Sequence, residues 1–112
     1  FVDVEPASFC IDTKKIEEKI SRKTRAILAP NLMGNLCDWK AIRKIANKYK
    51  IKLIEDASEA LGSIYKNKAL GTFGDIGTIS FNGNKIVTGP SIMIVTPYQA
   101  QLTNIFNEIE MF

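Results

Sequence analysis

Three side chains in the second half of the sequence have types and spacing that could support chemistry on a carbonyl compound. Asp56 follows the apolar run 51–54, Ser80 ends a later apolar run, and Lys85 lies just beyond Asn82-Gly83. A carboxylate and a hydroxyl can hold polar groups of a ligand, and a neutral lysine amine is a nucleophile. Taken singly, each has a plain structural reading: Asp56 could cap a short helix, and Lys85 could be one of many surface lysines.

The elements before Asp56 predict a parallel α/β sheet. The run 25–30 is short and almost wholly apolar, which is typical of a strand covered on both faces. Asp38 is a suitable N-cap for a helix with an apolar stripe that continues to Tyr49, and 51–54 supplies a second strand. Ligands bind outside the carboxyl ends of strands in open α/β sheets, and Asp56 lies at such an end.

The elements after Asp56 predict one antiparallel hairpin. Asn82-Gly83 separates the apolar runs 79–81 and 86–87, and this dipeptide favours a type I′ turn because both central residues need a positive φ. We expect a further strand at 91–96. Amphipathic helices are expected at both ends of the chain, over 13–20 and 97–112.

Composition limits the classes of function. The 112 residues are 46% hydrophobic, and their 15 basic and 12 acidic residues are interspersed, which gives a net charge of +3 and no basic stripe for nucleic acid. No apolar run approaches the ~20 residues of a membrane span. The two cysteines lie far apart and there is no histidine, so no metal site is predicted and reduced thiols in the cytoplasm are the default expectation.

Several motifs occur together in a characteristic order along the whole chain: Phe1–Glu5, Ile20–Leu28, Glu55–Gly62, Gly71–Asp75 and Ser80–Lys85. Their combination resembles the DegT/DnrJ/EryC1/StrS family of nucleotide-sugar aminotransferases. This resemblance implies the fold-type-I architecture, with a mostly parallel sheet, helices on both of its faces and one antiparallel hairpin. It also implies that 1–112 is the central part of the large, cofactor-binding domain.

The resemblance also implies a cofactor, pyridoxal 5'-phosphate, and a role for each motif residue. Lys85 would be the catalytic residue that forms the Schiff base, Asp56 would pair with the pyridine nitrogen, Ser80 would hold the phosphate and Glu59 would lie beside the ring. A carboxylate at the nitrogen keeps the ring protonated, as an electron sink requires. The released Lys85 amine would move the substrate proton.

The implied substrates are glutamate and a keto sugar linked to a nucleotide, used in bacterial surface polysaccharide or amino-sugar biosynthesis, and the implied assembly is a homodimer. Two features depart from the family pattern. A proline interrupts the usually glycine-rich stretch after the lysine, in Thr88–Ser91, and Asn31 stands where many members carry histidine. A second hypothesis is therefore a truncated, inactive remnant that keeps the fold or an interaction surface.

Overall fold

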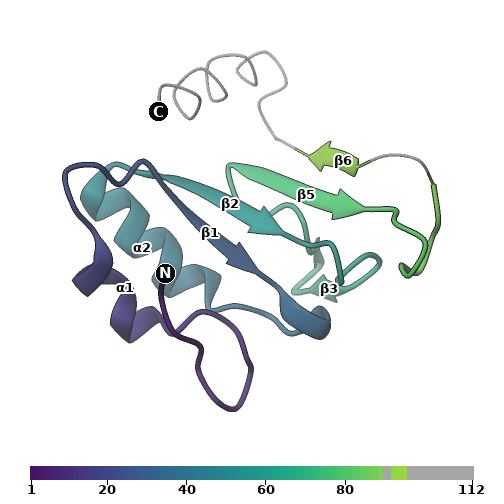
Figure 1. Cartoon of the computed structure of the whole chain (residues 1–112), viewed down its shortest axis with the longest axis horizontal. Helices are drawn as coiled ribbons and strands as arrows, with labels where there is room; N and C mark the ends of the chain where they lie inside the picture. The colour runs from purple at the N-terminus through teal and green to yellow at the C-terminus, as the bar shows by residue number, and fades with distance from the viewer. Residues whose placement is uncertain (90–91, 96–112) are drawn as a thin grey trace.

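The computed structural model describes residues 1–89 and 92–95, and its centre is a four-stranded mixed sheet (Figure 1). The strand order is β1-β2-β5-β6, and β1, β2 and β5 are parallel while β6 runs antiparallel to β5. The α/β class and the mostly parallel sheet are thereby confirmed. The strands are β1 (Ala26–Pro30), β2 (Lys52–Asp56), β5 (Ile76–Ser80) and β6 (Ile92–Val95).

Helix α2 (Trp39–Tyr49) connects β1 to β2, as the sequence predicted. The Asp38 carboxylate caps its first turn by accepting a hydrogen bond of 3.0 Å from the Ala41 N–H. At the other end Lys50 adopts the left-handed conformation, and its N–H bonds the last helical carbonyls. The helix thus begins and ends where local capping chemistry requires.

Strand alternation divides the sheet into two faces. The helix face, as we call it, packs against α2, and its members in β1, β2 and β5 are all buried. The open face carries Leu28, which is 57% exposed, together with polar side chains at the strand ends. The helix face consists of Ile27, Ala29, Leu53, Glu55, Gly77 and Ile79, and the open face of Leu28, Pro30, Ile54, Asp56, Ile76, Thr78 and Ser80.

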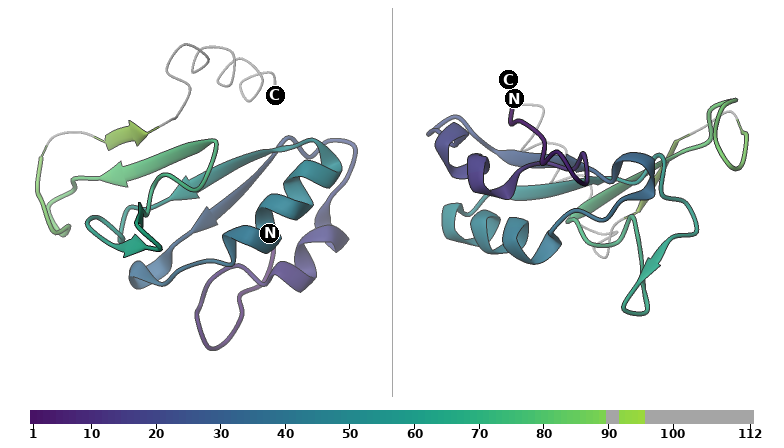
Figure 2. Two further views of the ribbon diagram at one scale, coloured as in Figure 1. Left: turned by 180° about the vertical axis from the view of Figure 1, so that it is seen from behind. Right: turned by 90° about the horizontal axis from the view of Figure 1, so that it is seen from below.

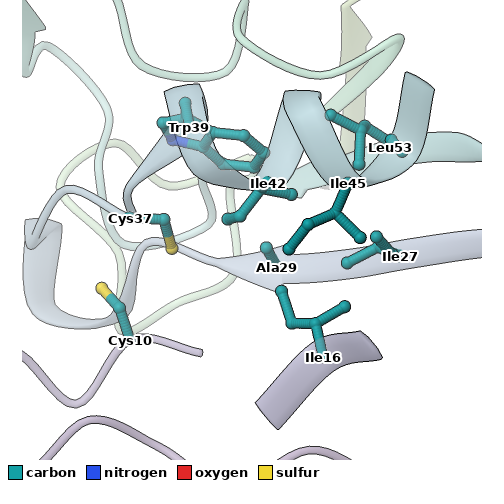
Figure 3. Packing of buried hydrophobic residues seen from close by; sticks show 10 residues of the cluster. Cys10, Ile16, Ile27, Ala29, Cys37, Trp39, Ile42, Ile45 and Leu53 are labelled. Carbon is teal, nitrogen blue, oxygen red and sulfur yellow. The ribbon is translucent and has the colours of Figure 1, made fainter. Parts of the chain in front are cut away.

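The main hydrophobic cluster lies between the helix face and the helices (Figure 3). Ile42 of α2 and Ile16 of α1 (Thr13–Lys19) both enter it, and each is almost completely buried. Cys10 and Cys37 pack at one end with their sulfur atoms facing each other. The prediction of helices on both faces is therefore met on one face only within the described residues.

The antiparallel pairing after β5 is confirmed, but the position of the turn was wrong. Ser80 pairs with Ile92, so the connection between the strands is a long segment and not a two-residue turn. Neither Asn82 nor Gly83 has a positive φ, and 86–87 is not a strand. The strand predicted at 91–96 is β6, whereas the helix predicted at 97–112 lies outside the described residues.

A second antiparallel hairpin, formed by β3 (Ile64–Tyr65) and β4 (Lys68–Ala69), was not predicted. Its turn residues Lys66 and Asn67 both have positive φ, 48° and 61°, which is the requirement of a type I′ turn. The hairpin projects on the same side of the sheet as α2 (Figure 2). The sequence did not predict this hairpin because its strands have only two residues each and show no apolar alternation.

Candidate active site at the strand ends

The parallel register brings the polar strand ends of β2 and β5 together on the open face. Asp56 is the last residue of β2 and pairs with Thr78, and Ser80 ends β5 two residues further along. All three side chains are half-buried. Because residues two apart in a strand share a face, Asp56, Thr78 and Ser80 form one polar edge.

The Asp56 carboxylate is held by two donors, both on the same oxygen. Oδ1 accepts 3.0 Å from the Ser58 N–H and 3.4 Å from the Thr78 hydroxyl. Within the part of the chain that the structure describes, no hydrogen bond reaches Oδ2, which leaves that oxygen for a donor from a ligand. No helix follows Asp56, so the alternative that it caps a short helix is wrong.

Lys85 and Glu59 form an ion pair. The Lys85 Nζ lies 3.7 Å from the Glu59 Oε1, and the lysine side chain is only 18% exposed. The second Glu59 oxygen accepts a hydrogen bond of 2.7 Å from the Met33 N–H. Glu59 thus connects the turn after β1 to the amine predicted to react.

Ser80 and the loop that follows it are linked by local hydrogen bonds. The Asn82 N–H donates to the Ser80 Oγ over 3.3 Å, and the Lys85 N–H donates to the Asn82 carbonyl over 2.9 Å. The loop closes where Gly89 N–H meets the Phe81 carbonyl at 2.7 Å. Among the described contacts, none joins the Asp56 side chain directly to that of Ser80 or Lys85.

Two important residues were not predicted as part of the site, Thr78 and Glu55. Thr78 could have been found from the register, since it lies opposite Asp56 in the neighbouring strand. Glu55 is fully buried on the helix face and accepts hydrogen bonds from Asn31 and from the loop 71–74. Its signal in the sequence was a charged residue inside an apolar strand, since a buried carboxylate needs partners.

Neither a metal-binding cluster nor a membrane-spanning helix occurs among the described residues. Across 1–89 and 92–95, no group of three or more His, Cys, Asp or Glu side chains is arranged to hold a metal ion. No helix within those ranges is both long and apolar enough to cross a bilayer.

The relatives of this chain include aminotransferases named for sugar substrates. GDP-perosamine synthase of Escherichia coli O157:H7 is 46% identical over 97 residues, which are 86% of this chain and 27% of the relative. The 3-oxo-glucose-6-phosphate:glutamate aminotransferase of Bacillus subtilis is 47% identical over 85 residues, 76% of this chain and 18% of the relative. The chain therefore spans about a quarter or less of these relatives.

A solved structure shares both the fold and much of the sequence. The crystal structure of NtdA from Bacillus subtilis with bound cofactor PMP superimposes with a TM-score of 0.75 at 42% identity, covering 86% of this chain and 22% of that one. The family model for the DegT/DnrJ/EryC1/StrS aminotransferase family matches residues 1–107. With that match over nearly its whole length, this chain belongs to the DegT/DnrJ/EryC1/StrS aminotransferase family.

Proposed function

We propose that this chain is the central part of the cofactor-binding domain of a pyridoxal-phosphate-dependent sugar aminotransferase. The observation that carries the proposal is the Lys85 amine, which is 18% exposed and faces the Glu59 carboxylate. A sheltered amine beside a carboxylate differs from the exposed helix lysines, such as Lys40 and Lys44. In this proposal Lys85 is the catalytic residue and the attachment point of the cofactor.

The residues present fit this cofactor. The unused Asp56 Oδ2 provides an acceptor for a protonated ring nitrogen, and a charge-assisted bond of this type is worth about 1.5–3 kcal/mol. The Thr78 hydroxyl and the Ser58 N–H fix the orientation of that carboxylate. When bound, pyridoxal phosphate supplies an electron sink for the carbon that gains or loses the amino group.

The protein residues contribute binding and proton movement. The Ser80 hydroxyl would bind a phosphate oxygen, and Glu59 would lie beside the ring and keep the Lys85 side chain oriented. The Lys85 amine would accept and return the proton at the reacting carbon, a role worth roughly 10²–10⁴ in rate. Asp56 would hold the proton of the ring nitrogen throughout.

We propose a nucleotide-linked keto sugar as the acceptor and glutamate as the amino donor, in a cytoplasmic homodimer. The names of the relatives support this choice, since one is a GDP-sugar synthase and another uses glutamate. Structural work on DesI in the presence of its TDP-sugar product supports a nucleotide sugar as well; that protein is 25% identical with a TM-score of 0.84.

The test is to trap the attached cofactor in the full-length protein. Pyridoxal phosphate is added, the covalent link is reduced with borohydride, and the labelled peptide is mapped by mass spectrometry. We expect label on Lys85, none in Lys85→Ala, and unchanged label in the exposed control Lys68→Ala. Asp56→Asn should retain the label but lower turnover with glutamate and a keto sugar nucleotide by about 100-fold or more.

The same experiment decides between this function and an inactive remnant. Label spread equally over Lys85, Lys66 and Lys68 would show ordinary amine chemistry and would support the remnant. Label confined to Lys85 without turnover by the full-length protein would refute the aminotransferase and leave only a cofactor-binding fold.

A further inference from the structure

Glu55 is the most completely buried charged residue described, with 0% of its surface exposed. Strand alternation directs it to the helix face, whereas its neighbour Asp56 lies on the open face. Four N–H groups donate to its two oxygens, and a carboxylate has about four acceptor positions, so its capacity is filled. The donors are Asn31 Nδ2 and Gly71 N to Oε1, both at 2.7 Å, and Phe73 N and Gly74 N to Oε2.

One arm of this network leads to Asn31, which is 1% exposed. Its Nδ2 donates to Glu55, while its Oδ1 accepts from the Cys37 N–H and from the Trp39 Nε1, each at 3.2 Å. Both ends of the amide are therefore used, and its orientation is fixed by the carboxylate on one side and two N–H donors on the other. The asparagine amide does not titrate, and it has both the donor and the acceptor that this bridge requires.

From Asn31 the connection continues to the reactive amine. The Asn31 carbonyl accepts from the Gly34 N–H at 3.1 Å, which closes the turn 31–34. Within that turn, Met33 has a left-handed φ of 55° and directs its N–H to Glu59, which pairs with Lys85. The position of this turn thus determines where the Glu59 carboxylate lies.

The other arm fixes the start of β5. The N–H groups of Gly71, Phe73 and Gly74 converge on the carboxylate, and the loop then enters β5. A side chain on Gly74 would begin 2.9 Å from the Glu55 nitrogen, so the loop lies directly against β2. Along β5 this placement sets Thr78, the donor to Asp56.

We propose that Glu55 is a positioning residue of the active site, acting from the opposite face of the sheet. It fixes the turn 31–34 and the loop 71–74, and through them it orients Glu59 toward Lys85 and Thr78 toward Asp56. This role rests on the proposed function for its chemical meaning. The orientation itself is a property of the cofactor-free protein and can be measured there.

Three variants of the full-length protein test the proposal. In Glu55→Gln the introduced NH₂ faces two N–H donors whichever way the amide turns, so the network loses part of its acceptors. In Asn31→Asp an added carboxylate faces Glu55, and like charges repel. In the double variant E55Q/N31D the introduced amide can donate to the introduced carboxylate, which restores all bonds except one, to the Gly71 N–H.

The readout is the rate of acetylation of Lys85 relative to the exposed Lys66, measured by mass spectrometry without cofactor and well below the unfolding temperature. We expect this ratio to rise about tenfold in each single variant, since a displaced Glu59 no longer shelters the amine, and to return most of the way in the double variant. Ile42→Val, which loosens the core without removing any hydrogen bond of the network, should lower the unfolding temperature and leave the ratio unchanged. That control separates positioning from general destabilisation.

An unchanged ratio in both single variants would overturn the proposal, as would a double variant no better than either. If E55Q does not fold, Asn31→Ser removes the Nδ2 donor to Glu55 together with the Oδ1 acceptor for Cys37 and Trp39, and it carries the same expectation. In the cofactor-loaded protein, E55Q should lower kcat more than it raises KM for glutamate. Because acetylation needs no cofactor, failure of wild-type Lys85 to bind pyridoxal phosphate would refute the proposed function while leaving this inference to be judged on the ratio.

Discussion

Replacement of Gly77 by alanine should be among the most damaging small substitutions in the chain. Gly77 lies in β5 opposite Glu55 and Val95, on the helix face. An added Cβ would lie 1.8 Å from the Gly71 oxygen and 2.6 Å from its carbonyl carbon. Real Cβ contacts essentially never fall under 3.0 Å, and here the neighbour is backbone, which cannot rotate away.

The backbone movement that an alanine at position 77 requires determines how much folding stability is lost. The Gly71 carbonyl would have to retreat by more than about 1 Å, and the N–H of the same residue is one of the four donors to Glu55. Ordinary overpacking of side chains costs about 1–3 kcal/mol, so we expect at least ~3 kcal/mol for a backbone clash that also breaks a buried hydrogen bond. Domains are stable by roughly 5–15 kcal/mol, which makes this loss a large fraction of the total.

Urea denaturation of the full-length protein, followed by circular dichroism, measures this loss. The matched control is Gly83→Ala, because a Cβ on Gly83 meets nothing within 4 Å. We expect G77A to be insoluble or to unfold at much lower urea, and G83A to resemble wild type. Equal midpoints for G77A and G83A would show that the loop 71–77 does not pack as described.

Three further predictions concern packing, protonation and thiol reactivity. Ile42→Ala should destabilise the protein by about 2–5 kcal/mol in the same assay, because the side chain is fully buried; a loss no larger than that of I42V would contradict this. Hydrogen bonds from Lys48 and Tyr49 lower the pKa of Glu17 below its ordinary value of 4.5. The contribution of Glu17 to folding stability is therefore present above pH 4.5 and is lost as the pH falls through the lowered pKa, so the difference in Tm between wild type and E17Q should shrink over that interval. Burial raises the pKa of the Cys37 thiol, so iodoacetamide should label it at pH 8 only after unfolding, and rapid labelling of the native protein would refute its burial.

The sequence was sufficient for the parallel core because its signals were local and strong. Asp38 as a cap, the apolar stripe of α2 and the apolar run of β1 each predicted their element within a residue or two. The turn at Asn82-Gly83 was wrong because a dipeptide preference is weaker than the tertiary pairing, which selected β6 as the partner of β5. Type I′ geometry occurs instead at Lys66 and Asn67, where no favourable dipeptide marks it.

The sequence predicted residues of the candidate site, but not the hydrogen bonds and ion pairs that hold them. Ordered motifs indicated Asp56, Ser80 and Lys85, and the structure puts Asp56 and Ser80 on one face and Lys85 against Glu59. The network beneath the site was missed because it depends on backbone N–H groups from the loop 71–74. Such donors are present at every residue except proline and have no signature in a sequence.

Glu55 and Asp56 lie on opposite faces of the sheet, so the arrangement of both carboxylates depends on the register of β2. Deleting or inserting one residue within Lys52–Asp56 would exchange the faces of all later side chains of the strand, so the Glu55 carboxylate would enter the open face and the Asp56 carboxylate the core. The exposed turn at Lys66 and Asn67, between β3 and β4, has no such constraint. Natural variation in chain length among relatives should therefore accumulate in surface turns of this kind and be absent from β2, which gives alignments of more distant members a fixed point from which to count.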